Sequence, residues 1–136
     1  MTGLGQFSDR PAGLLGERMG IQFLEATVDR VIARMPVEGN TQPYGVLHGG
    51  ASCVLAETVG SAAAMLWAGE DRIALGVDIN ATHHRAVTEG WVTAVATPAF
   101  RGRTSATYEV TINDDDGRRI CTARLTCVIR EAPVGP

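Results

Sequence analysis

Several features that would place a protein in a class at once are scarce in this sequence of 136 residues. Only three cysteines occur, Cys53, Cys121 and Cys127, and an odd number without C-x-x-C spacing argues against both a disulfide framework and a zinc site. Basic residues are not in excess, because the formal net charge is -3, which argues against a protein that binds nucleic acid or an anionic membrane. These absences predict no metal, no nucleic-acid partner and a reducing, cytoplasmic location.

Long apolar segments are scarce as well. The first twenty residues hold no basic start followed by an apolar stretch, so we expect no secretory signal. The longest apolar run, 62–68, is far shorter than the roughly 20 residues that cross a bilayer. The motif G-x-S-x-G is missing too, which disfavours a serine hydrolase. We therefore expect no membrane partner.

The residues that are present have the composition of one soluble globular domain, with 45% hydrophobic and 20% charged residues. We expect a lead-in or flap over 1–19, a single domain over 20–131 and a short tail over 132–136. In the lead-in, Ser8 and Asp9 are placed to cap a short helix near 11–15.

Hydrophobic periodicity predicts how this domain folds. Two short strands within 21–37 precede one long helix from about Gly49 to Trp67, whose all-round Ala, Val and Leu content predicts burial on most sides. Four further strands are expected, at 73–81, 90–98, 104–113 and 118–130, with the Asp-Gly chemistry of a hairpin between the last two. The predicted fold class is α+β, a curved antiparallel sheet wrapped around one long central helix. Its uncovered outer face and edge favour oligomerisation.

One carboxylate, Glu57, interrupts the apolar helix, and Ser61 follows it one turn later on the same face. An ionised group buried without a partner is costly, so this position is wet, paired or functional. An ion pair with an arginine of a neighbouring strand and a catalytic role are equally good explanations of Glu57 alone. Ser61 alone is most simply a small packing residue.

The start of the helix is the second candidate site. The sequence LHGG places His48 beside Gly49 and Gly50, and the free N–H groups and positive dipole of a helix start favour an anion or a developing oxyanion. Taken singly, His48 as a capping histidine and the glycines as turn residues are the commoner explanations. The combination with a glutamate two turns on favours catalysis.

Helix geometry relates the two candidate sites. Gly49 and Glu57 are eight residues apart, which is roughly 12 Å along a helix axis. One reacting carbonyl cannot touch both within one chain. Antiparallel helices across a two-fold axis would bring each Glu57 near the partner's Gly49, so the spacing predicts an active site formed only in a homodimer.

The segment 42–61, QPYGVLHGGASCVLAETVGS, closely resembles the active-site segment of hotdog-fold acyl-CoA thioesterases. The likeness is to the branch that contains PaaI-like enzymes, the Arthrobacter-type 4-hydroxybenzoyl-CoA thioesterase and the 1,4-dihydroxy-2-naphthoyl-CoA hydrolases. It continues through GVDINATHHR and GRTSATYEVTINDDDGRRICTARLT, and so covers residues 20–131.

This resemblance implies a role for each matched residue. Glu57 corresponds to the catalytic carboxylate, either a nucleophile on the thioester carbonyl or a general base for water. The Gly49 N–H corresponds to the oxyanion donor. His48 and Gln42 correspond to groups that orient the thioester and the leaving thiolate, and Ser61 to one that places the water or the glutamate. The resemblance implies that Gln42, His48 and Gly49 come from one subunit and Glu57 and Ser61 from its partner.

Coenzyme A carries phosphates, which need cations or free amides. The candidates are Arg85 and the loop residues Arg101, Gly102, Arg103 and Thr104. That these are ordinary solvated loop residues is an equally good explanation of each one singly. The resemblance also places His83 at the acyl pocket. His83 and His84 do not suggest a metal site, because no further His or Cys falls at ligand spacing.

The sequence therefore predicts an acyl-CoA thioesterase that acts on an aromatic acyl group, of hydroxybenzoyl, phenylacetyl or dihydroxynaphthoyl type, or on a medium-chain one. No cofactor is expected, since coenzyme A is part of the substrate. The homodimer would be the active unit and a homotetramer the full assembly. The alternative is a non-catalytic acyl-CoA-binding hotdog module, against which the presence of Glu57 argues. A hotdog hydratase is disfavoured because its Asp and His pattern is not found.

Overall fold

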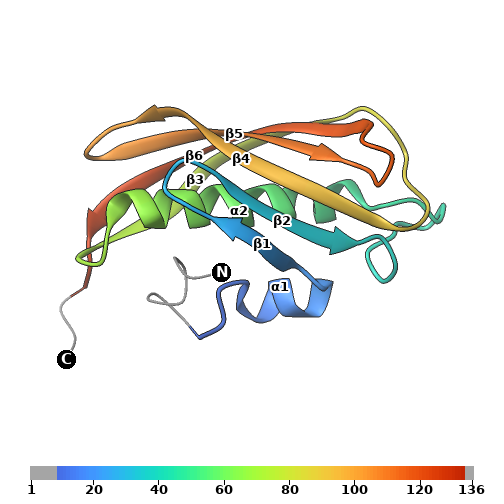
Figure 1. The fold of residues 1–136 in the computed structure, drawn as a ribbon, viewed down its shortest axis with the longest axis horizontal. Coiled ribbons are helices and arrows are strands. Elements are labelled where there is room, and N and C mark those ends of the chain that lie inside the picture. Colours follow the sequence, from blue (N-terminus) through green and yellow to red (C-terminus); the bar gives the residue numbers. More distant parts are fainter. Residues whose placement is uncertain (1–8, 134–136) are drawn as a thin grey trace.

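The computed structural model describes residues 9–133 as a six-stranded antiparallel sheet that arches over one long helix (Figure 1). The elements in chain order are α1 (Gly13–Met19), β1 (Gln22–Ala26), β2 (Val31–Pro36), α2 (Gly49–Ala68), β3 (Arg72–His83), β4 (Trp91–Arg101), β5 (Ser105–Asn113) and β6 (Arg119–Glu131). The strands lie in the order β1-β2-β4-β5-β6-β3, so β1 and β3 form the edges. The predicted α+β architecture, with a curved sheet around a central helix, is confirmed.

Helix α2 lies along the concave face of the sheet (Figure 1). Its buried residues are Ala51, Ser52, Leu55, Ala56, Val59, Gly60, Ala62, Ala63, Ala64 and Ala68. By length and composition alone α2 is apolar enough to cross a bilayer, but more than half of that stretch is buried within the fold. This burial is that of the core helix of a folded domain.

Strand β5 shows why alternation in the sequence predicts a half-buried strand. Ala106, Tyr108, Val110 and Ile112 are each 0% exposed, while Glu109 between them is exposed. Side chains of a strand alternate between its two faces, so one set of positions packs on α2 and the other faces outwards. The predicted inward set of β5 is therefore confirmed.

Helix α1 differs from its prediction. It spans Gly13–Met19 instead of 11–15, and its N-cap residue is Ala12, which makes no side-chain cap. The proposed capping by Asp9 is therefore wrong, and Ser8 lies outside the described residues. The helix ends at Gly20, whose left-handed conformation (φ 79°) lets its N–H return to the last turn.

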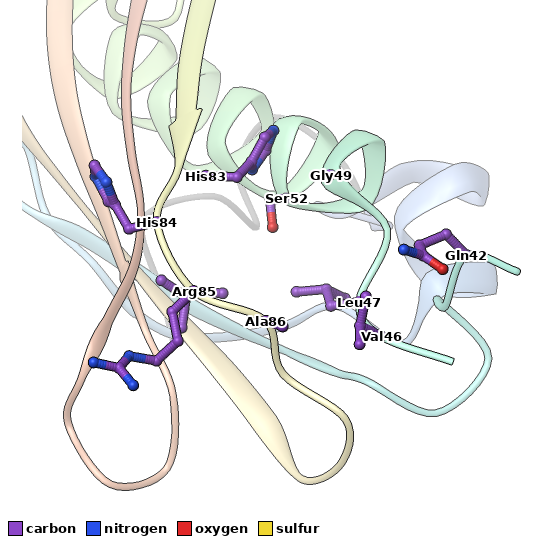
Figure 2. Close-up of a pocket in the computed structure, with 10 residues that line it drawn as sticks. Gln42, Val46, Leu47, Gly49, Ser52, His83, His84, Arg85 and Ala86 are labelled. Atoms are coloured by element: carbon purple, nitrogen blue, oxygen red, sulfur yellow. The ribbon is translucent and has the colours of Figure 1, made fainter. Parts of the chain in front are cut away.

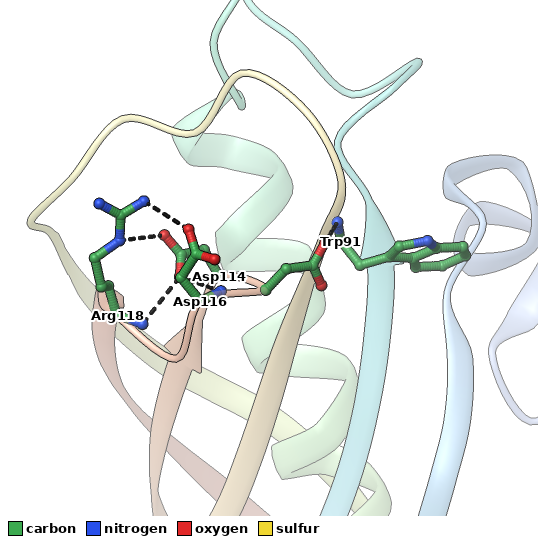
Figure 3. A network of polar contacts seen from close by, with 5 residues as sticks. Trp91, Asp114, Asp116 and Arg118 are labelled. Atoms are coloured by element: carbon green, nitrogen blue, oxygen red, sulfur yellow. Dashed lines mark hydrogen bonds and ion pairs between the residues drawn. The ribbon is translucent and has the colours of Figure 1, made fainter.

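The hairpin between β5 and β6 is held by its aspartates (Figure 3). Asp114 Oδ1 accepts hydrogen bonds from the backbone N–H groups of Asp116 and Arg118, at 3.0 and 2.9 Å, and Arg118 Nε donates to Asp114 Oδ2 at 3.1 Å. These bonds, the one from the Arg118 N–H above all, hold the pKa of Asp114 below its usual value. Asp115 Oδ2 accepts from the Trp91 N–H at 3.0 Å, which ties the hairpin to the start of β4. In residues 9–133 no group of three or more acidic, His or Cys side chains has the geometry of a metal site.

Strand β3 is a long edge strand that leaves apolar side chains uncovered. Leu75 and Val77 are 50% and 59% exposed. The register between β3 and β6 shifts between Gly76 and Asp78, so Val77 is the extra residue of a β-bulge. Exposed edges with apolar side chains are templates for pairing with a further strand.

Candidate active site

The first four N–H groups of α2 have different fates, and one of them stays free. Ala51 and Ser52 both donate to the His48 carbonyl, at 3.0 and 3.3 Å. The Gly50 N–H donates to His48 Nδ1 at 2.8 Å. Within residues 9–133 nothing accepts from the Gly49 N–H. Of the two glycines that the sequence offered, only Gly49 keeps an amide for an anion or oxyanion at the positive end of the helix dipole.

His48 is the N-cap residue of α2, as the simpler explanation of its sequence position held. Because the Gly50 N–H must be the donor, His48 Nδ1 accepts, and the neutral imidazole carries its proton on Nε2. The cap therefore fixes the tautomer and leaves Nε2–H as an exposed hydrogen-bond donor. His48 lines one pocket together with Gly50 and Ala51, whereas Gly49 lines another, so the structure does not bring His48 into the same cavity as Gly49. Capping and catalysis are compatible roles for this side chain.

Glycine at 49 also makes room for His83. A Cβ at Gly49 would lie 2.8 Å from His83 Nε2, so the imidazole at the end of β3 occupies the space beside the helix start. Both residues line a cavity of about 310 Å³, to which Gln42, Ser52 and Arg85 contribute polar groups (Figure 2). The structure thus brings Gln42, Gly49 and His83 together.

The walls of this cavity combine apolar and polar residues. The apolar ones are Val46, Leu47, Ala86 and Ile120, and His84 adds a further polar side chain to those already named. Ser52 is 2% exposed, and its hydroxyl points from α2 towards the segment that carries Ala86 (Figure 2). No residue in the described part of the chain forms a hydrogen bond with that hydroxyl. Arg85 reaches the cavity by its backbone side, while its guanidinium points away from α2 (Figure 2).

Gln42 is held in a tight loop before the helix. Its side-chain carbonyl accepts a hydrogen bond from the Tyr44 N–H, and its backbone N–H donates to the Val46 carbonyl at 2.9 Å. The carbonyl end of the amide is therefore engaged, so the NH₂ group is the part of Gln42 left to face a ligand.

Glu57 does not lie in the cavity, and it is exposed in the single chain, although the helix around it is buried on most sides. Sequence hydrophobicity misleads here because α2 presents Glu57 between buried residues but at the margin of the sheet, beside the edge strand β3. Within residues 9–133 the carboxylate forms no ion pair or hydrogen bond, so the alternative of an arginine partner does not hold.

Cys127 of β6 lies beside both Glu57 and Ser61. Burial raises the pKa of the Cys127 thiol, the Ser61 hydroxyl opposes that shift, and the negative charge of Glu57 adds to it. The two predicted helix residues therefore face the same point of the sheet. They lie near each other but two turns away from Gly49.

The residues predicted to hold coenzyme A lie at the two ends of the molecule. Gly102, Arg103 and Thr104 follow β4 near the end of α2, where Trp67 Nε1 donates to the Gly102 carbonyl at 2.9 Å. The Gly102 N–H donates to Ser105 O at 2.8 Å, so the prediction of a free amide there is wrong. A tight turn consumes that N–H, which sequence alone did not reveal.

Arg101 is also engaged within the fold. Its guanidinium pairs with Asp29 at 3.0 Å and lies over the ring of Trp67, with 4.8 Å from Cζ to the ring centroid. The exposed Arg103 side chain forms no ion pair or hydrogen bond with any residue that the structure describes. Of the two loop arginines, Arg103 is the one free for a phosphate.

Sequence reasoning missed two residues that the structure places at these sites. Ser52 lines the cavity, and Gly76 lies under the Glu57 carboxylate, because a Cβ there would meet Glu57 Oε2 at 2.6 Å. The serine was hidden among small helix residues. The glycine's neighbour is 19 positions away in sequence, so no local pattern pointed to it.

Comparison with known proteins gives the family. The family model described as "Thioesterase superfamily" matches residues 44–121. The proofreading thioesterase EntH of Cronobacter turicensis is 45% identical over 118 residues, which cover 86% of this chain and 86% of that protein. Thioesterase HI1161 of Haemophilus influenzae superposes with a TM-score of 0.87 at 37% identity, covering 94% of this chain and 90% of that one. The chain therefore belongs to the thioesterase superfamily, and it is a hotdog-fold thioester hydrolase.

A third relative bears on the site. The Staphylococcus aureus thioesterase SAV0944 has a TM-score of 0.83 at 31% identity, covering 87% of this chain and 99% of that one. Solved variants of it replace a glutamate and a glutamine by alanine, and the two replaced positions are 15 residues apart in that protein. Gln42 and Glu57 have the same separation of 15 here.

Proposed function

We propose that this thioesterase hydrolyses an acyl-CoA at a site shared between two copies of the chain, with Glu57 as the catalytic carboxylate. One observation carries the proposal. Along a single helix, α2 presents a free Gly49 N–H at its positive end and, two turns on, an exposed Glu57 carboxylate beside the edge strand β3, with no ion pair within residues 9–133. An oxyanion donor and a carboxylate are the two groups that thioester hydrolysis needs.

The reaction follows from these groups. The thioester carbonyl oxygen points at the Gly49 N–H, which stabilises the negative charge that grows there as the carbonyl carbon is attacked. In one route Glu57 takes a proton from water, and the water oxygen attacks; in the other a Glu57 oxygen attacks and water cleaves the resulting anhydride. In both routes the C–S bond breaks, and the sulfur leaves as the thiolate of coenzyme A, for which His48 Nε2–H is the proposed hydrogen-bond donor.

Two features support a dimer as the active unit. Gly49 and Glu57 are roughly 12 Å apart along α2, too far for one carbonyl to meet both. The β3 edge, with Leu75 and Val77 half exposed or more, is a surface for a second copy. Pairing across a two-fold axis would give each helix start the partner's carboxylate. The exposed outer face of the sheet, which includes Phe100, would join two dimers into a tetramer.

The same symmetry would unite the proposed coenzyme A contacts. His83 and Arg85 lie near the start of α2, whereas Arg103 lies near its end, about 30 Å away along a 20-residue helix. Antiparallel helices would bring Arg103 of one copy towards the helix start of the other. We infer that the phosphates of the coenzyme A part of the substrate bind Arg103 there.

The cavity supports a compact acyl group. Its volume of about 310 Å³, and a lining that mixes apolar side chains with the imidazoles of His83 and His84 and the Ser52 hydroxyl, suit an aromatic ring that carries an oxygen substituent. This agrees with the branch that the sequence resembles, the PaaI-like, 4-hydroxybenzoyl-CoA and dihydroxynaphthoyl-CoA enzymes. A cytoplasmic location would supply such thioesters. Medium-chain acyl groups remain the second choice.

Thiol release from a panel of benzoyl, hydroxybenzoyl, phenylacetyl, dihydroxynaphthoyl and octanoyl thioesters of coenzyme A tests the proposal. The wild type and Glu57→Ala are assayed in parallel, with sedimentation to show that both remain dimers. We expect Glu57→Ala to lower kcat by at least about 10³-fold, since it removes the attacking or proton-accepting group. Wild-type turnover in the variant would refute the role of Glu57. If the wild type bound these thioesters saturably but did not hydrolyse them, the protein would be a non-catalytic acyl-CoA-binding module instead.

A further inference from the structure

The Glu57 carboxylate rests on the backbone of β3 at Gly76. A Cβ built at Gly76 would lie 2.6 Å from Glu57 Oε2 and 3.4 Å from its Cδ, closer than atoms pack without a shift. The Glu57 carboxylate therefore fills the space that a side chain at position 76 would need. This contact does not depend on an ion pair, because Glu57 has none within residues 9–133.

A second observation places the carboxylate at the same point. Gly76 pairs with Cys127 in the register between β3 and β6. The negative charge of Glu57 reaches that thiol and contributes to its raised pKa, after burial and the opposing Ser61 hydroxyl. The Gly76 position also meets Leu125 Cδ1, at 3.4 Å. Gly76, Leu125 and Cys127 thus form a socket that receives the end of the Glu57 side chain.

We propose that Gly76 is a positioning residue for Glu57: the missing side chain leaves the socket in which the carboxylate is held for attack. This rests on the proposed function of Glu57. The β-bulge that follows Gly76 bends the strand at this point, and bulges near active sites re-aim side chains.

The socket explains how the flexible Glu57 side chain keeps one orientation although its carboxylate has no charged partner. Glu57 has three rotatable bonds, and holding it costs side-chain entropy that an ion pair would ordinarily offset. Contact with a backbone surface restricts it instead. An added methyl group at position 76 meets only the far end of this side chain within 3.0 Å, so the carboxylate would move while the strand stays.

Four proteins test the inference: wild type, Gly76→Ala, Glu57→Ala and the double variant. Gly76 does not have a positive φ, so alanine fits the backbone. Displacing a catalytic group by about 1 Å costs up to about 10²-fold, so we expect Gly76→Ala to lower kcat by about 10- to 100-fold with KM within about twofold. Thermal midpoint and sedimentation should match the wild type, and the same substitution should have no effect in the Glu57→Ala background.

Each other outcome has one meaning. Wild-type kcat in Gly76→Ala, or an equal loss in both backgrounds, would overturn the positioning role and leave that of Glu57 intact. Unchanged turnover in Glu57→Ala would instead overturn the proposed function itself. Asn80→Ala, at another exposed position of β3, is the control for disturbance of the edge strand and should keep kcat near the wild-type value.

Discussion

His48 caps α2, and in the proposed function it is also a donor at the active site. Its Nδ1 accepts from the Gly50 N–H, and this bond both caps α2 and fixes the proton on Nε2. A capping serine or asparagine would satisfy the same N–H but would offer no donor at the distance of Nε2. The two roles can therefore be separated by substitution.

His48→Asn and His48→Ala separate them. Asparagine is among the best N-cap residues, so His48→Asn should keep the free energy of unfolding, whereas His48→Ala should lose about 1 kcal/mol. Both remove the Nε2–H donor and should lower kcat/KM by about 10- to 100-fold. Urea unfolding and steady-state kinetics on the two variants check this. If His48→Asn kept full activity, the histidine would be a cap alone.

The Tyr108 hydroxyl is fully shielded from solvent and has no hydrogen-bond partner within residues 9–133. Burial of the phenol raises the pKa of Tyr108 from 10.0 to about 12. The folded state therefore keeps this proton between pH 10 and 12 while the unfolded chain releases it, so stability present below pH 10 is lost as pH rises through that window. Burial likewise raises the pKa of Cys121, from 9.0 to about 11, which starts the loss near pH 9.

Tyr108→Phe should remove the part of the pH-dependent loss of unfolding free energy that the phenol causes above pH 10, up to about 2 to 3 kcal/mol. At pH 7 the variant should be as stable as the wild type or more stable by about 1 kcal/mol, because it no longer buries an unpaired hydroxyl. Urea unfolding at pH 7, 9 and 11 measures both effects. Parallel curves of stability against pH for the two proteins would show that the phenol does not titrate with unfolding.

Among whole elements, α2 and β6 lie close together at Gly60. A Cβ at this position would lie 2.6 Å from Leu125 Cδ2 and 3.2 Å from its Cβ. Leu125 is 1% exposed and has no free space to retreat into. Glycine is thus kept in the middle of a helix, against its poor helix propensity, by the distance between helix and sheet.

Gly60→Ala should therefore destabilise the protein even though alanine is the better helix former. The gain in propensity is about 1 kcal/mol, and the strain of overpacking costs about 1 to 3 kcal/mol, so we expect a net loss. Thr58→Ala in the same helix removes atoms and improves propensity, and should be neutral or stabilising. A thermal midpoint of Gly60→Ala above that of the wild type would contradict the close packing.

These elements also show what the sequence could and could not predict. Period-two alternation placed β5 correctly because its partners lie on both sides and bury one face. The composition of α2 predicted its burial but not the uncovered stripe at Glu57, since that depends on where the sheet ends. The Gly102 amide and the Gly76 socket depend on contacts between segments distant in sequence, which local patterns do not encode.

For the whole molecule, a single chain is an incomplete enzyme in this account. Its helix start holds a free amide, its carboxylate lies two turns on against the edge strand β3, and that strand exposes apolar side chains. Closing that edge with a second copy is proposed to complete two sites at once. Substitution of Val77 by a charged residue would weaken the assembly and the activity together, without a change at either catalytic group.

The decisive measurement is complementation between two inactive chains. His48→Ala and Glu57→Ala chains are co-expressed with different tags, and the species carrying both tags is isolated. If the site is shared across the dimer, this heterodimer contains one site with both wild-type groups and should show about half of the wild-type activity per dimer. If His48 and Glu57 act within the same chain, every site carries one lesion, and the heterodimer will be as inactive as its parents.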